Sequence, residues 1–404
     1  MRVLALASYD SFLNTASLIA PYFERNGCEF EYALVRARSK TQITQEQIAG
    51  LALGSPVRWI TIEDLCGSAE AARYDIILSC LEGLSTRRLV HHLAPLGEKR
   101  PLVISVYPGL VLRYPFDGYS MRTASDLVWL NCKSDLLAFQ NMCNAFGVDG
   151  RGARIFGIAP LLQPIERDSA AEDGPVVFFE QAIIPRYHDE RLYLAEQFVR
   201  LAKRHPQIEF IVKPRTMGKD ATLHRTWHAI EPLLKEAAER QGGWPANLSL
   251  SSEKASALLA RASHCLTVSS TVATEAIHAG VPTTIIGDFG AHDDYGLSYF
   301  FGSGLIRNFI ELAFPFAAQP NDEWLSRYMA DPRGTIANLV QEAIRMAAEP
   351  RQPMTERSLR AEMSPELRAY LTARNGNFGV LNRSYQSKPR GRFRRLLSKV
   401  GVKI

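Results

Sequence analysis

The stretch LTVSSTVATEAIHAGVPTTIIGDFG, residues 266–290, decides the fold class of this chain. An apolar run ends in Ser-Ser-Thr at 269–271, and a helical pattern follows without a gap. Gly280 and the Val-Pro pair after it end that helix and open a second apolar run. A strand, a helix and a further strand in this order form a βαβ unit, which belongs to a parallel sheet covered by helices.

The junction between strand and helix in this stretch also has the chemistry of a binding site. Ser269, Ser270 and Thr271 bring hydroxyls to a helix N-terminus, where free backbone N–H groups and the helix dipole favour an anion. Glu275 follows about one turn later, where its carboxylate can accept hydrogen bonds from a ribose. The alternative is a simple helix cap, which needs only one hydroxyl. The complete order therefore favours a nucleotide site.

Alternation of the same kind runs through both halves of the chain. In the first half, apolar runs predict strands at residues 3–8, 75–81, 101–106, 127–131 and 153–159. The polar segment at 164–175, PIERDSAAEDGP, marks a linker, after which the alternation restarts. Because 404 residues exceed what a single core usually holds, we predict two doubly wound, Rossmann-like α/β domains facing each other across a cleft, the GT-B architecture.

This alternation sets the expected limits of the domains. We place the N-terminal domain at residues 1–165 and the C-terminal domain at 173–345. Residues 346–386 are expected to form helices that pack back on the N-terminal domain, and 387–404 form a basic tail. No GxGxxG follows the first strand, so the sequence argues against a dinucleotide cofactor such as NAD.

A second group of candidate ligands follows two other strands of the C-terminal domain. EFIV ends in Lys213 and Arg215, and ligands bind at the carboxyl ends of the strands in such sheets. Both cations suit a phosphate or carboxylate, and His224 in the next loop could donate to the same anion. Gln181 closes the first strand of this domain, where it could contact a base or brace a phosphate. The alternatives are a solvated charge run, an exposed histidine and a glutamine that only holds a turn.

Two further features of the C-terminal domain are weaker. Ser303 lies between two glycines, and this Gly-Ser-Gly could form a small nest for an anion, although it is more often a plain turn. Asp293 and Asp294 lack a further ligand at useful spacing, so we predict no metal site.

Charge and cysteine usage limit the compartment and the partners. Six cysteines are scattered without CxxC spacing, which indicates reduced thiols in a cytoplasm. The sequence has no apolar run long enough to cross a membrane. Of the net charge of +5, the tail alone contributes seven cations, so the folded part is close to neutral and nucleic acid is not an expected partner.

The tail itself has an amphipathic pattern. Residues 388–403 read KPRGRFRRLLSKVGVK, and Phe393, Leu396, Leu397 and Val400 would share one face of a helix. Short basic helices of this kind lie in a membrane interface, so we expect peripheral attachment to the cytoplasmic face of the inner membrane. A disordered solubilising tail is the alternative.

These motifs resemble those of a family of bacterial glycosyltransferases encoded beside surface-polysaccharide genes. The resemblance is dense over 175–310 and follows the order F-x-Q-x-x-x-P, V-K-P-R, T-x-H, V-S-S-T-x-x-x-E-A-x-x-x-G-V-P, D-F-G and G-S-G-L. More distantly, the layout is similar to the CMP-sugar enzymes, the bacterial sialyl-, polysialyl- and Kdo-transferases. Those enzymes hold the CMP phosphate with K-P-H-P and S-S/S-T elements. Here Arg215 stands where histidine is usual.

The resemblance implies a reaction. It implies transfer of a sugar, such as a nonulosonic acid of the sialic or Kdo type, from a CMP-linked donor held by the C-terminal domain. The acceptor would be a cell-surface glycan or a lipid-linked glycan on the N-terminal side. No cofactor beyond the donor and no metal is required, because Lys213, Arg215 and the helix amides can offset the charge of the leaving group.

The acid or base for this reaction would come from the N-terminal domain. Asp117 and Glu82 each precede a glycine and resemble the carboxylate-glycine element of the CMP-sialyltransferases, and Asp10 after the first strand is a third choice. We favour Asp117 because its loop also supplies Arg113 and Arg122 for an acidic acceptor or sugar carboxylate. The alternative for each carboxylate is a helix cap or a turn.

Other functions fit the same architecture. A UDP-sugar-dependent transferase, a nucleotide-sugar epimerase or hydrolase, and a protein that only binds the donor would all share it, because fold alone does not determine function.

Overall fold

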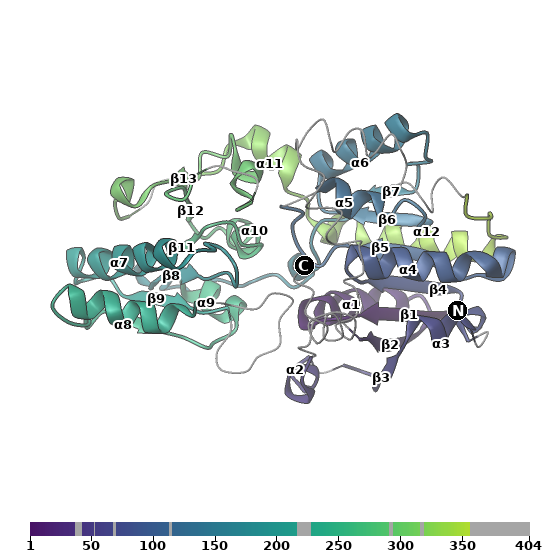
Figure 1. Ribbon diagram of the computed structural model, residues 1–404, viewed down its shortest axis with the longest axis horizontal. Helices are drawn as coiled ribbons and strands as arrows, with labels where there is room; N and C mark the ends of the chain where they lie inside the picture. Colours follow the sequence, from purple (N-terminus) through teal and green to yellow (C-terminus); the bar gives the residue numbers. More distant parts are fainter. Residues whose placement is uncertain are drawn as a thin grey trace, which may run out of the picture.

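The computed structural model shows two lobes side by side, each built on a parallel sheet (Figure 1). It describes residues 1–36, 43–51, 53–67, 70–112, 115–215, 228–290, 294–315 and 319–355. The predicted ligand His224, the segment 356–386 and the basic tail 387–404 lie outside the described residues. The prediction of two doubly wound α/β domains of the GT-B type is confirmed.

The first lobe contains a sheet of seven strands in the order β3-β2-β1-β4-β5-β6-β7. Its strands are β1 (Arg2–Ala7), β2 (Glu29–Val35), β3 (Val57–Ile60), β4 (Ile76–Cys80), β5 (Leu102–Val106), β6 (Leu127–Leu130) and β7 (Ala153–Ile155). Its helices are α1 (Asp10–Glu24), α2 (Gln45–Ala49), α3 (Ile62–Gly67), α4 (Gly83–Leu93), α5 (Pro115–Ser120) and α6 (Lys133–Phe146). Helices cover both faces, so β4 and β5 are buried along their whole length and read as continuous apolar runs.

The second lobe repeats this arrangement with six strands in the order β10-β9-β8-β11-β12-β13. Its strands are β8 (Val176–Phe179), β9 (Phe210–Lys213), β10 (Leu248–Leu250), β11 (His264–Thr267), β12 (Thr283–Ile286) and β13 (Ile306–Arg307). The helices that follow are α7 (His188–Arg204), α8 (Ile230–Arg240), α9 (Ala255–Arg261), α10 (Val272–His278) and α11 (Asp322–Tyr328). All pairs in both sheets are parallel.

The chain returns to the first lobe after α11. Helix α12 (Ile336–Ala348) packs Ile336, Leu339 and Val340 into the core built around β1 and β4. In Figure 1 it runs along the first lobe although it follows the second in sequence. Because α12 follows the second lobe in sequence but packs into the core of the first, it ties the two lobes together. Residues 336–345 of this helix lie within the range predicted for the C-terminal domain, 173–345.

Candidate functional site between the lobes

The strand order of each sheet fixes where a ligand can bind. In the first sheet the order reverses between β1 and β4, and in the second between β8 and β11. Such switch points leave a crevice outside the carboxyl ends of the two strands, where open α/β sheets bind their ligands. Asp10 and Glu82 follow β1 and β4, while Gln181 and Ser269 follow β8 and β11. Four of the predicted site residues therefore lie at the two switch points.

Gln181 and Ser269 hold the crevice of the second lobe together. The Ser269 backbone N–H donates to Gln181 Oε1 at 2.9 Å, and Gln181 Nε2 donates to Ser269 Oγ at 3.2 Å. The Ser269 hydroxyl also donates to the Tyr295 carbonyl oxygen, and its side chain is fully buried. Both side chains are thus occupied within the protein, so we expect them to shape the crevice and the two residues after Ser269 to meet a ligand.

Ser270 and Thr271 lie at the surface of the same junction. Ser270 Oγ accepts a hydrogen bond from the Val272 N–H at 3.3 Å, as in a local turn. Thr271 Oγ1 accepts from the Leu110 N–H of the first lobe at 3.3 Å. Gly109 allows this approach, because a Cβ there would stand 2.9 Å from Thr271 Oγ1. The strand-to-helix junction predicted to bind an anion therefore faces the other lobe directly.

Glu275 lies one turn into α10 and is largely removed from solvent. Burial raises the pKa of its carboxyl to about 7, and no described residue donates a hydrogen bond to it. A carboxylate that lacks a protein partner in such surroundings is suited to accept hydrogen bonds from ligand hydroxyls. The geometry is consistent with the predicted contact to a ribose, which stays a prediction.

A buried ion pair fixes the cationic strand end of this lobe. Glu180 and Arg191 form a salt bridge in which both side chains are almost completely buried. The second oxygen of Glu180 accepts from the Arg215 backbone N–H at 3.0 Å. Glu180 and Arg191 were not among the predicted site residues, yet they set the position of one that was. Glu180 directly follows β8, and this position could have indicated it, whereas Arg191 lies within α7 and has no such signal in the sequence.

The remaining predicted ligands of the second lobe differ in their placement. Lys213 ends β9 and is half-buried. Ser303 is completely buried, and its hydroxyl accepts from the Leu305 N–H at 3.1 Å. The burial argues against contact between Ser303 and the donor, because the hydroxyl serves a turn inside the core. Among the described residues, no group of three or more acidic, His or Cys side chains is placed to hold a metal ion.

On the first lobe, Glu82 is held by two serine hydroxyls. Ser8 Oγ donates to Glu82 Oε2 and Ser85 Oγ donates to Glu82 Oε1, both at 2.6 Å. Ser8 follows β1 and Ser85 lies in the first turn of α4, so the carboxylate bridges the two sides of the switch point. Both oxygens of Glu82 are therefore engaged before any substrate binds.

Asp117 has different surroundings. It lies in the first turn of α5, partly buried, and burial raises the pKa of its carboxyl to about 6. Its carboxylate has no hydrogen-bond partner among the described residues. A carboxyl group with these properties can exchange a proton near neutral pH, which is what a general base or acid requires. The role predicted for Asp117 is compatible with this environment and stays a prediction.

The structure corrects the role expected for Arg122. Its side chain is buried, stacks over the Tyr107 ring with the guanidinium carbon 4.1 Å from the ring centroid, and cannot meet an acidic substrate. Its two terminal nitrogens donate to the Gly118 and Leu81 carbonyl oxygens, each at 2.9 Å. These carbonyls neighbour Asp117 and Glu82 in sequence. Arg122 thus joins the two candidate loops and fixes their separation.

Asp10 reaches across to the second lobe. Its Oδ2 lies 3.7 Å from an Arg215 terminal nitrogen, and its Oδ1 is buried with no hydrogen-bond partner in the described part of the chain. The third catalytic choice and a predicted phosphate ligand thus form an ion pair between the lobes.

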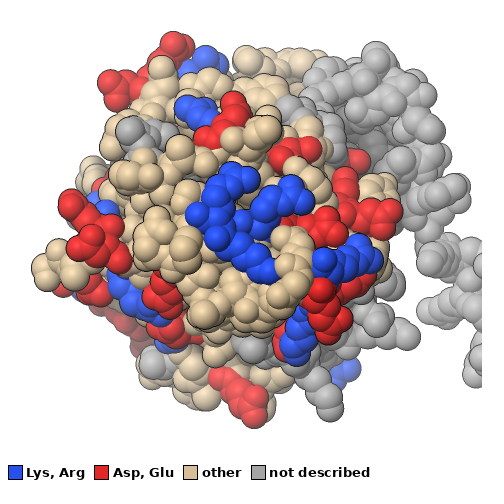
Figure 2. All heavy atoms as spheres, turned by 90° about the vertical axis from the view of Figure 1, so that its left-hand side faces the viewer, with Lys and Arg blue, Asp and Glu red and all other residues tan. Residues whose placement is uncertain are grey.

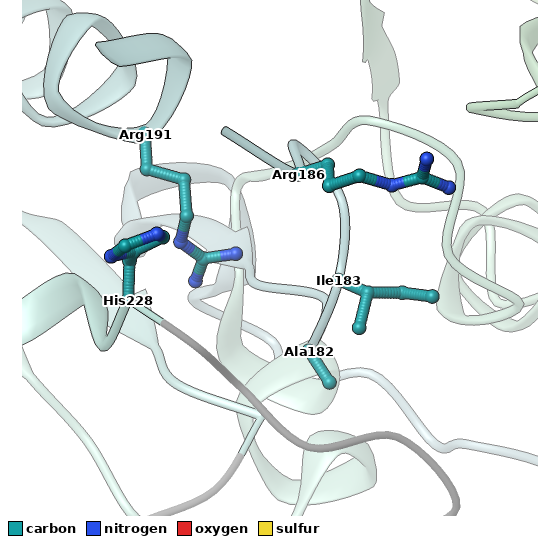
Figure 3. A pocket seen from close by; sticks show the side chains of 5 residues that line it. All are labelled: Ala182, Ile183, Arg186, Arg191 and His228. Carbon is teal, nitrogen blue, oxygen red and sulfur yellow. The ribbon is translucent and has the colours of Figure 1, made fainter. Parts of the chain in front are cut away.

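A small cavity adjoins this site on the second lobe. It measures about 190 Å³ and is lined by Ala182, Ile183, Arg186, Arg191 and His228. In Figure 3 the Arg191 guanidinium lies beside the His228 ring, while Arg186 points away from both. The lining combines apolar and cationic groups without a carboxylate, and Arg191 links it to Glu180 and hence to Arg215. Only the Glu180 side chain separates Arg191, in the cavity wall, from the backbone of Arg215, a predicted phosphate ligand.

Two parallel, doubly wound sheets in separate lobes define a protein of the GT-B fold. Residues 3–344 match the model of a family described as "Putative glycosyltransferase (DUF6716)", and the chain belongs to this family. A comparison with curated proteins gave no match.

Solved structures of the same fold include two UDP-GlcNAc 2-epimerases. The enzyme from Methanocaldococcus jannaschii is 12% identical with a TM-score of 0.59, over 85% of this chain and 100% of the other. The enzyme from Neisseria meningitidis, solved with UDP-GlcNAc bound, is 12% identical with a TM-score of 0.54, over 86% of this chain and 100% of the other. At this level of identity the likeness establishes the fold and leaves the reaction open.

Proposed function

We propose that this protein is a glycosyltransferase that binds a nucleotide-sugar donor on its second lobe and an acceptor on its first. One observation carries the proposal. The groups proposed to bind the donor lie at the carboxyl edge of the second sheet and the candidate catalytic carboxylates at the carboxyl edge of the first, and the contact between Arg215 and Asp10 supports their closeness. Membership of a family with a glycosyltransferase description supports the same reaction class.

The donor would occupy the switch point of the second sheet. Arg215, Lys213 and the hydroxyls of Ser270 and Thr271 offer charge-assisted and neutral hydrogen bonds to phosphate oxygens. Glu275 would accept from the ribose. The cavity beside Arg191 gives room for a further part of the nucleotide, with apolar walls for a base or cationic groups for a phosphate.

The chemistry would use Asp117 as the proton-accepting group. Its carboxylate would take the proton of an acceptor hydroxyl as the oxygen attacks the anomeric carbon and the bond from that carbon to the nucleotide breaks. The negative charge that develops on the leaving nucleotide would be stabilised by Arg215 and Lys213. Glu82 is a weaker candidate, because both of its oxygens already accept hydrogen bonds.

The resemblance to the CMP-sugar enzymes favours a CMP-linked nonulosonic acid as the donor. Those enzymes usually have histidine where this chain has Arg215, and because of this difference a UDP-sugar is the second candidate donor. Thermal unfolding of the protein with CMP, CDP, UMP, UDP and GDP distinguishes them, because the nucleotide that binds raises the apparent stability. Arg215→Ala and Ser270→Ala should each weaken its binding about ten-fold or more, from the loss of charge-assisted or helix-terminal hydrogen bonds. Unchanged titration calorimetry in both variants would remove the proposed donor site.

An epimerase, a hydrolase and a transferase act differently on the donor. An epimerase or hydrolase changes a labelled nucleotide sugar without acceptor, whereas a transferase releases nucleotide only with a glycan or lipid-linked acceptor. We propose that this acceptor is presented at the cytoplasmic face of the inner membrane and that the basic tail holds the protein there. Within the described residues, no helix is both long and apolar enough to cross a membrane.

A further inference from the structure

The ion pair between Asp10 and Arg215 joins two groups that are held in place for different reasons. Arg215 is fixed at its backbone, because its N–H donates to Glu180, which is 5% exposed. Glu180 is in turn held by Arg191, which is 1% exposed. The main chain at Arg215 therefore cannot shift easily, while its side chain is 42% exposed and remains accessible to a ligand.

Asp10 is anchored by the first lobe. It is the first residue of α1, directly beyond the carboxyl end of β1. Its Oδ2 faces Arg215 at 3.7 Å, which is within ion-pair range but longer than a charge-assisted hydrogen bond. Its Oδ1 is buried and has no partner among the described residues. The contact is therefore an incomplete pairing for both groups, and a ligand with better geometry can compete for the cation.

We propose that Asp10 and Arg215 form an exchange pair, in which the anionic group of the donor replaces Asp10 as the partner of Arg215. This inference rests on the proposed function, which places the donor at Arg215. A phosphate or carboxylate offers two oxygens to the guanidinium, which favours bidentate binding over the single long contact with Asp10. Neutral ligands cannot make this exchange, so the pair selects for a negatively charged donor.

The exchange has a consequence on the other lobe. Once the Arg215 guanidinium binds the donor, Oδ2 of Asp10 loses its ion-pair partner, while Oδ1 stays buried as before. It is then left with two oxygens that can accept hydrogen bonds, at the carboxyl edge where the acceptor would lie. Donor binding thereby prepares the first lobe for an acceptor hydroxyl, and the donor should bind before the acceptor.

The test is a double-mutant cycle on anion binding by the full-length protein. Asp10→Asn should tighten binding of the nucleotide about two- to five-fold, the range expected for an exposed ion pair that no longer competes. In the Arg215→Met background, which binds weakly, Asp10→Asn should change nothing. Glu82→Gln is the matched control, because it removes an equal charge at the same switch point without a contact to Arg215.

Inorganic pyrophosphate serves as a second probe in the same titrations. If pyrophosphate shows the cycle and no nucleotide binds, the exchange holds and the proposed function fails. If Asp10→Asn leaves both affinities unchanged or weakens them, the exchange is overturned. The exchange is also overturned if Glu82→Gln tightens binding equally, or if Asp10→Asn still tightens binding in the Arg215→Met background. Either result would reflect the overall electrostatic field of the protein and not the Asp10–Arg215 pair.

Discussion

Three carboxylates of the first lobe were candidates for the same catalytic task, and their surroundings separate them. Glu82 accepts two serine hydroxyls, and Asp10 faces a guanidinium. Asp117 has neither kind of partner in the described part of the chain, and burial alone raises the pKa of its carboxyl to about 6. A carboxylate retains basicity when nothing stabilises its charge. Asp117 is therefore the group best adapted to take a proton near neutral pH.

This assignment predicts a pH profile for transfer. The base must be ionised, so kcat/KM should rise about ten-fold per pH unit below pH 6 and level off above it. Asp117→Asn should reduce kcat by at least about 100-fold and leave nucleotide affinity within about two-fold, because the group acts on the barrier and not on donor binding. Asn keeps the size of the side chain, so thermal stability is the control. Full activity in the variant would exclude Asp117 and make Glu82→Gln the next test; full activity there as well would direct attention to Asp10.

Glu275, which we propose to contact the ribose, should lower the stability of the folded protein near neutral pH. Burial raises the pKa of its carboxyl from 4.5 to about 7, so the folded protein binds the proton more tightly than the unfolded chain. Stability should therefore fall as the pH rises from about 4.5 to 7, where the buried group must ionise. Glu275→Gln should remove this loss, so that the variant is more stable than the natural protein at pH 8 and similar at pH 4.

The same variant tests the ribose contact. Glu275→Gln should weaken nucleotide binding several-fold, since a neutral amide accepts hydrogen bonds less strongly than a carboxylate. Denaturant unfolding at the two pH values and calorimetry at pH 8 measure the two effects. A variant that is less stable at pH 8, or that binds nucleotide with unchanged affinity, would contradict the assignment of Glu275 to the donor site.

At the scale of the elements, the strand ends of the second sheet depend on a buried ion pair. Arg191→Met leaves Glu180 charged, buried and without its cation, which should cost about 3–5 kcal/mol of stability. Replacing both residues, with Arg191→Met and Glu180→Leu, should restore much of this loss because no unpaired charge remains. Urea unfolding of the natural protein and both variants measures these differences in the free energy of unfolding. A single variant as stable as the double one would show that the pair contributes little.

The elements themselves were largely predictable from the sequence. The five strands predicted in the first half are β1, β4, β5, β6 and β7. The first four are buried over all or nearly all of their length, and such parallel strands read as apolar runs. Strands β2 and β3 were missed. β2 carries Glu29 and Glu31 among its apolar residues, and β3 is a short edge strand with no fully buried residue. Their pairing is set by neighbours distant in sequence, which a local pattern cannot reveal.

The site was predictable only in part, for the same reason. Ser269 and Gln181 were selected for their positions at strand ends, but their mutual hydrogen bonds link residues 88 apart in sequence. Arg122 and Arg191 carry charges that usually lie in solvent, and only the packing of other elements buries them. Sequence patterns therefore locate the strand ends, while the three-dimensional contacts decide which side chains remain available to a ligand.

At the scale of the whole molecule, the two lobes are joined at several points. Thr271 contacts Leu110, Asp10 contacts Arg215, and α12 completes the core of the first lobe after the chain has left the second. The linker is held as well, since Arg167 donates to the Gly280 and Ala262 carbonyl oxygens at 3.0 and 2.8 Å. Two of these contacts, Thr271 with Leu110 and Asp10 with Arg215, involve the proposed donor-binding residues, so ligand binding and lobe arrangement should be coupled.

The last prediction concerns how the molecule meets its acceptor. Seven cations and no acidic residue lie between 388 and 403, and each cation near an anionic surface contributes about 1 kcal/mol to binding. The full-length protein should therefore sediment with anionic liposomes at low salt and be released as salt screens the charges. Deleting residues 386–404 should abolish sedimentation and leave activity on a soluble acceptor unchanged.

The second lobe provides the control for this experiment, because basic side chains also gather on its end face (Figure 2). Exposed cations of this lobe include Arg200, Lys203 and Arg204 in the last turns of α7, where they complement the helix dipole. Replacing these three with glutamine in the full-length protein should leave liposome binding intact if the tail is the attachment element. If the truncated protein still sediments and the glutamine variant does not, the membrane contact belongs to the second lobe and the role proposed for the tail is wrong.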